Sequence, residues 1–283
     1  MLQFISFGSG SCGNCSLLTN GRDSILIDAG VGIRHLKKFF REYGVKTQLI
    51  RGILITHDHT DHTKAAGYVS ADYGFKVYAT QRVHEGMLRN YHTTRKVDGH
   101  YRVDIEKDKV LQLGSLSITP FHIPHDSADN VGYCIESDGE VFTLMTDVGC
   151  VTEQVNQYIS KSNYLVIEAD YDTEMLQKGP YPPYLQKRIM SDSGHMSNDQ
   201  CAQALAENFH EQLRNVWLCH LSEENNHPEL ARKTVEMKLR QYGIIAGKDF
   251  QLDVLRRGLP TGPWTLGEAM MEVPTLLNLF EHE

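Results

Sequence analysis

Residues 56–62 read THDHTDH, which places three histidines and two aspartates in seven consecutive positions directly after a short apolar run. In an extended chain, residues two apart face the same side, so His57 and His59 can bind one metal ion. Asp61 and His62 fall where the chain is expected to turn into a helix, and they can bind a second ion. Imidazole and carboxylate donors without cysteine suit Zn, Mn or Fe. A polar turn with exposed histidines is the alternative, but the HxHxDH spacing favours a metal site.

A site for two ions needs more than these four ligands, and the ends of later strand-like runs offer three. These residues are His125, Asp147 and His220. Each stands where a strand is expected to give way to a loop, which is the usual position of site residues on a rigid scaffold. His122 competes with His125, and we favour His125 because His122 is expected to lie within the strand.

Residues 191–198, SDSGHMSN, indicate a different kind of chemistry. Ser197 and Gln200 form an S-x-x-Q capping box, which predicts a helix from Asn198. The free N–H groups at a helix N-terminus favour an anion. His195 precedes this terminus, so beside two metal ions it would bind a phosphate oxygen or protonate the leaving oxygen. A capped helix with an incidental histidine is the alternative.

Short apolar runs alternate with helix-like patterns along the chain, which predicts an α/β fold of two β-sheets packed together and flanked by helices. Strand-like runs are 2–7, 15–19, 24–28, 50–55, 76–79, 110–113, 116–122, 131–136, 141–146, 163–168 and 215–220. Helix-like runs are 32–43, 61–73, 81–90, 151–160, 182–190, 198–209 and 228–242.

The domain organisation expected from these patterns is simple. No linker or repeat divides the chain, so we expect residues 1–283 to form one domain. Residues 171–196 are expected to form an inserted helical segment. Residues from about 259 to 283 are expected to form a partly loose C-terminal tail.

The composition is that of an ordinary globular chain, with 41% hydrophobic residues, 23% charged residues and a net charge of −8. No window approaches the roughly 18 apolar residues of a membrane span, and the N-terminus lacks the basic start of a signal peptide. Only Cys12 and Cys15 of the six cysteines form a CxxC pair, so reduced thiols are expected. We therefore expect a cytoplasmic protein. The acidic net charge argues mildly against a non-specific nucleic-acid binder, although a local basic groove is compatible with it.

The order of these motifs resembles that of the metallo-β-lactamase fold, an αββα sandwich. The order is HxHxDH, a lone histidine, an aspartate after a strand and a last histidine after a strand. The resemblance spans residues 1 to about 258, and Asp28 in ILIDAG matches the first motif of that superfamily. It implies that Asp28 supports the ligand loop from behind. By the resemblance, one ion takes His57, His59 and His125, the other takes Asp61, His62 and His220, and Asp147 bridges them.

Two ions arranged in this way share a hydroxide, which is a nucleophile at neutral pH. Asp61 would also help to orient this hydroxide. Zn²⁺ suits the histidine-rich ligand set and Mn²⁺ is compatible with donors that are all nitrogen or oxygen, so the residues leave the native metal open.

Five stretches are similar to the YycJ/WalJ (VicX) branch of this fold: FGSGSCGNCSLL, THDHTDH, IEADYDTEML, SDSGHMSN and HLSEENNHPE. Members of that branch are taken to be 5′→3′ DNA exonucleases linked to mismatch repair. The resemblance implies a phosphodiesterase that uses a bridging hydroxide to attack phosphorus in DNA, at duplex ends or nicks. One departure is IEADYD, where Asn-His is expected near Asp170-Tyr171, and this puts in doubt any role assigned there.

The glycine-rich segment GSGSCGNCS is expected to form a tight turn near the site, because it lacks both the Walker lysine and the GxGxxG spacing of nucleotide-binding loops. Ser11 and Asn14 in this turn are candidates for substrate contact. Glu168 is expected to end a strand beside the cleft, where it would orient His195 or serve only as a buried hydrogen-bonding group.

Two rival functions follow from the same residues. The first is a small-molecule hydrolase of this fold, such as a cyclic phosphodiesterase or a lactonase, and a narrow closed pocket would favour it. The second is a non-catalytic metal-binding scaffold, which a single or occluded ion would favour.

Overall fold

The computed structural model describes residues 1–267, and within this range the strands form two seven-stranded sheets. In spatial order, sheet 1 contains β14 (Thr261–Leu266), β1 (Leu2–Gly8), β2 (Cys15–Thr19), β3 (Ser24–Ile27), β4 (Ile50–Leu54), β5 (Val77–Ala79) and β6 (Arg102–Asp104). Sheet 2 contains β13 (Gln251–Val254), β12 (Asn215–Cys219), β11 (Tyr164–Glu168), β10 (Glu140–Met145), β9 (Val131–Ser137), β8 (Leu116–His122) and β7 (Leu111–Leu113).

Both sheets are mixed. In sheet 1 the strands from β14 to β3 pair antiparallel, and those from β3 to β6 pair parallel. In sheet 2 the strands from β7 to β10 pair antiparallel, and those from β10 to β13 pair parallel. The carboxyl ends of parallel strands meet at one edge of a sheet, so each sheet offers one edge at which loop residues from separate strands gather.

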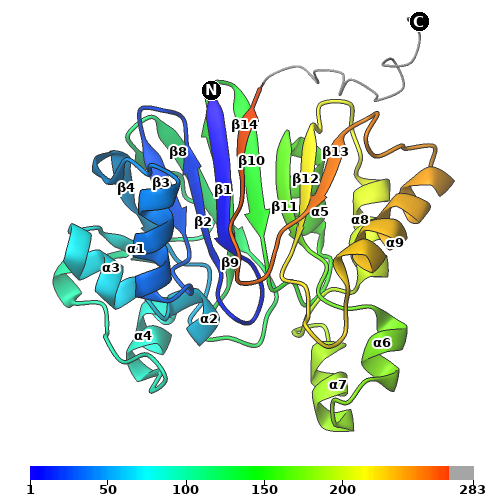
Figure 1. Cartoon of the computed structure of the whole chain (residues 1–283), viewed down its shortest axis with the longest axis horizontal. Coiled ribbons are helices and arrows are strands. Elements are labelled where there is room, and N and C mark those ends of the chain that lie inside the picture. Colours follow the sequence, from blue (N-terminus) through cyan, green and yellow to red (C-terminus); the bar gives the residue numbers. More distant parts are fainter. Residues whose placement is uncertain (268–283) are drawn as a thin grey trace, which may run out of the picture.

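Helices cover the outer faces of the sheets (Figure 1). Sheet 1 is flanked by α1 (Ile33–Glu42), α3 (Ala66–Tyr73) and α4 (Gln81–Arg89). Sheet 2 is flanked by α5 (Glu153–Lys161), α8 (Asn198–Glu207) and α9 (Pro228–Gln241). The remaining helices are α2 (Thr60–Thr63), α6 (Thr173–Lys178), α7 (Pro183–Ile189) and the short 3₁₀ turns Thr47–Leu49 and Gly99–Tyr101. The predicted αββα arrangement is therefore confirmed.

Side-chain alternation along the strands divides the hydrophobic core into three layers. On β1, Phe4 faces the interior between the sheets, and Phe7 faces outward against α1. The Phe4 ring lies 5.0 Å from the Trp217 ring of sheet 2, and Phe7 lies 5.6 Å from Phe40 of α1. Strand residues two apart share a face, so one strand contributes to both layers. These layers hold the strand ends rigidly.

Three strands escape the sequence analysis. β6 and β13 are short edge strands that are only partly buried, so they lack a long apolar run. Residues 261–266, expected in a partly loose tail, form β14, which pairs antiparallel with β1. The Gly262-Pro263 step there is typical of a turn, but an edge strand tolerates it. The expected tail beyond residue 267 lies outside the described residues.

Two other expectations concern helices. The run 61–73 is broken into α2 and α3, which are separated by Lys64 and Ala65. The expected inserted segment 171–196 contains α6 and α7, which project beyond the sheets on the same side as α2 (Figure 1). A search of the described residues finds no helix that combines the length and hydropathy needed to span a bilayer.

Candidate metal centre

Three of the predicted site residues occupy sharp turns at strand ends. Asp28 follows β3, Asp147 follows β10 and His220 follows β12. Their φ angles are 61°, 55° and 56°, in the left-handed region that residues other than glycine rarely adopt. Such backbone conformations persist only where the surrounding structure enforces them, and they are concentrated at functional sites.

The first cluster of donors contains His57, His59 and His125, whose ligand atoms lie within 4.8 Å of one another. His59 Nδ1 and His125 Nε2 are 3.4 Å apart. His57 Nε2 is buried and has no hydrogen-bond partner among the described residues. An unpartnered buried nitrogen is costly in a native protein unless something else binds it. The three rings therefore converge as ligands of a common cation would.

The second cluster contains Asp61, His62 and His220, again within 4.8 Å of one another. Asp61 Oδ2 lies 3.3 Å from His62 Nε2 and 3.5 Å from His220 Nε2. Asp61 and His62 belong to α2, and the His62 ring centroid lies 4.1 Å from that of His57 in the first cluster. His57, His62 and Asp147 also lie within 4.8 Å of one another, so the division of HxHxDH into two ligand pairs stays a prediction.

Asp147 lies between the two clusters. Its Oδ2 is 3.3 Å from His62 Nε2, and its Oδ1 is 3.5 Å from His220 Nε2 and 3.8 Å from His125 Nε2. Burial would raise the pKa of this carboxyl group, but the nearby imidazoles of His220, His62 and His57 outweigh burial and hold it well below its usual value. Asp147 therefore presents a carboxylate to both clusters.

Hydrogen bonds behind the clusters fix which ring nitrogen faces inward. Asp28 Oδ2 accepts a hydrogen bond from His62 Nδ1 at 2.7 Å, and Asp28 Oδ1 accepts one from the Thr56 backbone N–H at 2.8 Å. His125 Nδ1 donates to the Gly194 carbonyl at 3.0 Å. In both rings this leaves Nε2 for the cluster, as in histidines that bind metals. The donor set of imidazoles and carboxylates, with one buried nitrogen unpartnered, fits divalent cations.

His195 lies beside the clusters, on the face formed by His220. The two rings stack with their centroids 5.3 Å apart and an angle of 9° between their planes. His195 Nδ1 is 2.9 Å from Glu168 Oε1. Burial would lower the pKa of His195. The negative charges of Glu168, Asp170 and Asp147 outweigh this effect of burial and raise the pKa to about 9. Divalent cations bound nearby would oppose this increase.

Glu168 is fully buried at the end of β11. Its Oε2 accepts hydrogen bonds from the backbone N–H groups of Val148, at 2.8 Å, and Met196, at 3.0 Å. Its Oε1 faces His195 and lies 3.4 Å from His220 Nδ1. Burial alone would raise the pKa of Glu168, but the charge of His195 and the contacts with the His195 and His220 side chains lower the pKa to about 2. Glu168 is thus buried with its Oε1 facing His195 Nδ1, a geometry compatible with both roles expected for it.

The turn between β1 and β2 brings one of its two candidate residues to the cluster. Asn14 Nδ2 lies 2.9 Å from His62 Nε2 and 3.2 Å from Asp61 Oδ2. Ser11 is exposed and, within the described part of the chain, forms no hydrogen bond with the cluster. His122 ends β8 and its Nδ1 faces Lys107 Nζ at 3.0 Å, so it lies apart from the donors, in agreement with the preference for His125.

Sequence reasoning missed several supporting residues. Ser9 Oγ accepts a hydrogen bond from the His220 backbone N–H at 2.8 Å. Asp170 Oδ1 lies 3.6 Å from His220 Nδ1. Arg188 of α7 donates to Asp126, the neighbour of His125, at 3.1 Å. The basic pair Lys187-Arg188 was visible in the sequence, but nothing there connects it to Asp126.

Comparison with known proteins agrees with this architecture. Residues 23–216 match the beta-lactamase superfamily domain. Exodeoxyribonuclease YycJ of Bacillus anthracis is 30% identical to this chain, over 92% of this chain and 97% of its own length. Exodeoxyribonuclease WalJ of Streptococcus pneumoniae serotype 2 (strain D39 / NCTC 7466) is 33% identical, over 88% of this chain and 93% of its own length.

The fold is also found among solved structures. The Zn²⁺-bound PqqB from Methylobacterium extorquens superposes with a TM-score of 0.66 and 17% identity, covering 93% of this chain and 100% of its own. At that identity the likeness concerns the fold alone. The sequence relatives carry the assignment further: the chain belongs to the metal-dependent hydrolases of the metallo-β-lactamase fold, in the family of YycJ and WalJ.

Proposed function

We propose that the chain is a 5′→3′ DNA exonuclease with two divalent metal ions, Zn²⁺ or Mn²⁺, in the centre described above. The observation that carries this proposal is His195, held by Glu168 against His220 at the edge of the two clusters. A second support is that the relatives of 30% and 33% identity are named exodeoxyribonucleases. DNA is therefore the substrate class that we assign to the site.

Each predicted ligand has a role in this proposal. His57, His59 and His125 would hold one ion, Asp61, His62 and His220 the other, and Asp147 would contact both. Ions bound there would supply Lewis-acid chemistry, which activates water and stabilises the negative charge of a phosphodiester. Asp61 has a second function, because its side chain is the least buried carboxylate of the clusters and can accept a hydrogen bond from the attacking water.

His195 would act on the phosphate rather than on the metal. Its Nδ1 is bound to Glu168, so its Nε2, which has no partner among the described residues, is free for the substrate. A protonated His195 can donate from Nε2 to a phosphate oxygen or to the leaving oxygen. The backbone N–H groups of residues 195–198 already bind protein acceptors, so the anion site expected at the start of α8 is not formed by them.

The decisive experiment is the digestion of a 5′-phosphorylated DNA duplex labelled separately at each end, with Mn²⁺ or Zn²⁺ present. We expect mononucleotides to appear progressively from the 5′ end, and we expect a chelator to stop the reaction. His195→Ala should reduce the rate by about 10²-fold to 10⁴-fold, the usual contribution of general acid–base catalysis. His122→Ala is the matched control, because His122 lies outside the cluster, and it should digest DNA at the wild-type rate.

The same samples separate this proposal from its rivals. A protein that holds two ions but digests no duplex in either metal would contradict the proposal, and cyclic phosphodiesters and lactones would then be tested. Release from the 3′ end would overturn the polarity alone. The link to mismatch repair stays a prediction of the family resemblance.

A further inference from the structure

Charge is distributed very unevenly along this acidic chain. Residues 1–109, which include every strand of sheet 1 except β14, contain 16 lysines and arginines against 11 aspartates and glutamates. Residues 110–283 contain 12 against 25. The net charge of −8 is therefore a balance between a positive N-terminal part and a strongly negative remainder. A polyanionic substrate is attracted to the N-terminal part.

The positive charge is concentrated on α1 and the turn that follows it. Residues 30–51 contain six basic residues and one acidic residue, Glu42. Arg34, Lys37 and Arg41 follow an i, i+3, i+7 spacing, so their side chains form one stripe along the helix. All three are exposed, and so is Lys46 in the turn after the helix.

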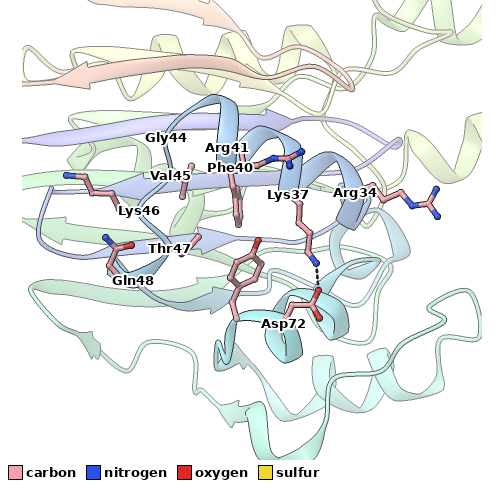
Figure 2. Close-up of a pocket in the computed structure, with 11 residues that line it drawn as sticks. Arg34, Lys37, Phe40, Arg41, Gly44, Val45, Lys46, Thr47, Gln48 and Asp72 are labelled. Atoms are coloured by element: carbon pink, nitrogen blue, oxygen red, sulfur yellow. Dashed lines mark ion pairs between the residues drawn. The ribbon is translucent and has the colours of Figure 1, made fainter.

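These four side chains line a surface groove, which we call the α1 groove (Figure 2). Its volume is about 910 Å³, and its other wall is formed by Asp72 and Tyr73 at the end of α3. In Figure 2, Arg34 and Lys46 lie at opposite ends, with Lys37 and Arg41 between them. The basic groups thus line the groove along its whole length.

The segment that leads into α1 packs against the loop that carries the candidate metal ligands. The loop before α1 contains Asp28, and its Ala29 N–H donates to the His62 carbonyl at 2.8 Å. Gly30 packs against the Asp61 carbonyl so closely that a Cβ atom would not fit. From there α1 runs 10 residues, or about 15 Å. A DNA strand presents one phosphate per 3.4 Å or so of helix axis, so this length spans about four phosphates.

We propose that the α1 groove binds the backbone phosphates of the DNA strand that extends from the metal centre. This inference rests on the proposed exonuclease function and adds a path for the substrate. Arg34, Lys37, Arg41 and Lys46 contact phosphates in turn, without reading the bases. The site therefore favours a long strand over a small phosphodiester, although both reach the metal centre.

Asp72 opposes this binding. Its carboxylate lies 2.7 Å from Lys37 Nζ and 3.7 Å from Arg95. A phosphate in the groove has to compete with Asp72 for Lys37. Asp72→Asn is therefore expected to increase affinity for DNA, by about two- to fivefold, the usual strength of a surface ion pair. A gain of affinity is a useful readout because misfolding does not produce it.

The test compares two substrates of the metal-loaded enzyme, the 5′-phosphorylated duplex and thymidine 5′-(p-nitrophenyl phosphate), over a range of salt concentrations. The variant is Arg34→Gln/Lys37→Gln/Arg41→Gln. We expect its ratio of kcat/KM for duplex over ester to fall about 10- to 100-fold near physiological salt. We also expect the slope of log kcat/KM for duplex against log salt to become shallower by about 2 to 3, one unit or slightly less per lost phosphate contact.

The matched control is Lys233→Gln/Lys238→Gln/Arg240→Gln, which removes the same charge from α9 on the opposite flank (Figure 1). It should leave both the ratio and the slope unchanged. An α1 variant that digests duplex with the wild-type ratio and slope, or an Asp72→Asn protein that binds DNA no more tightly, would overturn the groove and leave the exonuclease proposal intact. A wild-type enzyme that cleaves the ester but not the duplex would overturn the exonuclease proposal, and the groove with it.

Discussion

The two halves of the metal centre are assembled in different ways. The half on sheet 1 contains four candidate donors in residues 57–62, which form the loop after β4 and the start of α2. The half on sheet 2 takes one donor from each of three separate strand ends, namely His125, Asp147 and His220. A loop can position four donors only if it is itself held rigidly, whereas single donors depend on the packing of their strands. The half on sheet 1 therefore depends on contacts that hold its loop, and the half on sheet 2 depends on the packing of its strands.

Both halves use a buried carboxylate for that support. Asp28 binds a backbone N–H with one oxygen and His62 with the other. Glu168 binds two backbone N–H groups with one oxygen and His195 with the other. The arrangement is the same, but Asp28 fixes a proposed metal ligand and Glu168 fixes the histidine proposed to act on phosphate. Metal content and catalysis should therefore respond separately to changes in the two halves.

The largest effect is expected from Asp147→Asn, because Asp147 faces both clusters. The amide removes the charge that would bind both ions, so we expect the loss of most of the metal and a decrease in activity of more than about 10²-fold, beyond the range for supporting residues. Asp61→Asn should mainly lose the ion of its own cluster. Metal per chain, measured by inductively coupled plasma mass spectrometry, distinguishes these results.

Asp129→Asn is the control for Asp147→Asn, since the Asp129 carboxylate binds Lys107 and Thr80 rather than any donor of the clusters. It should retain the wild-type metal content. If Asp147→Asn kept two ions per chain, Asp147 would not be the shared ligand and the proposed division of the centre would be wrong.

The second prediction tests the two supporting carboxylates against each other. Asp28→Asn should weaken metal binding by about 10- to 100-fold, because it releases His62. Glu168→Gln should reduce kcat by a similar factor, because it releases His195, while the protein retains its metal. Titration of metal into each apo-protein and single-turnover digestion of DNA measure the two quantities.

Thermal unfolding of both variants controls for general damage to the fold. A Glu168→Gln protein that lost metal as readily as Asp28→Asn would mean that its contact with His220, at 3.4 Å, outweighs its contact with His195. The contrast between the two halves would then disappear.

The same contrast explains how much of the molecule was predictable from its sequence. Residues 57–62 form a compact pattern, so their convergence on one site could be inferred locally, whereas their division into two ligand groups stays a prediction. His125, Asp147 and His220 carry no local pattern. They were found because each follows a buried strand, and the short edge strands β6 and β13 were missed because that apolar signal was weak.

Contacts between distant segments were beyond local reasoning. The shared use of Glu168 by Val148, Met196 and His195 depends on how β11 packs beside two loops. The net charge was misleading in a similar way, because a single sum hides the basic stripe on α1. The spacing of residues in the sequence identifies the candidate donors. The packing of distant segments determines which residues hydrogen-bond to those donors and hold them in place.

The smallest effect on activity is expected from substitution of Asp23. This residue links sheet 1 to sheet 2 and is not among the candidate metal ligands. Asp23 lies in the turn between β2 and β3, and its Oδ2 accepts hydrogen bonds from Ser115 N at 2.7 Å and Ser115 Oγ at 2.6 Å, in the turn between β7 and β8. Arg51 also binds its carboxylate. Asp23→Ala should lower the free energy of unfolding by about 1 kcal/mol, since it removes the acceptor of the partly buried Ser115 donors, with little change in kcat. Urea denaturation measures this loss.

The pH dependence of this loss of stability distinguishes the contact made by Asp23 from a neighbouring contact between the two sheets. The hydrogen bonds from Ser115 chiefly, with help from Arg51, lower the pKa of Asp23 to about 2, against burial, which would raise it. An unfolded aspartate has a pKa near 3.9 or so. The stabilisation is thus fully present above about pH 4 and is lost as the pH falls toward 2. Asp138→Asn removes the charge of the exposed Arg22–Asp138 pair at a position whose φ of 51° asparagine tolerates, and it should change the free energy of unfolding less than Asp23→Ala does. An Asp23→Ala deficit as small as that one, or one that persisted at pH 2, would show that the buried carboxylate does not join the sheets.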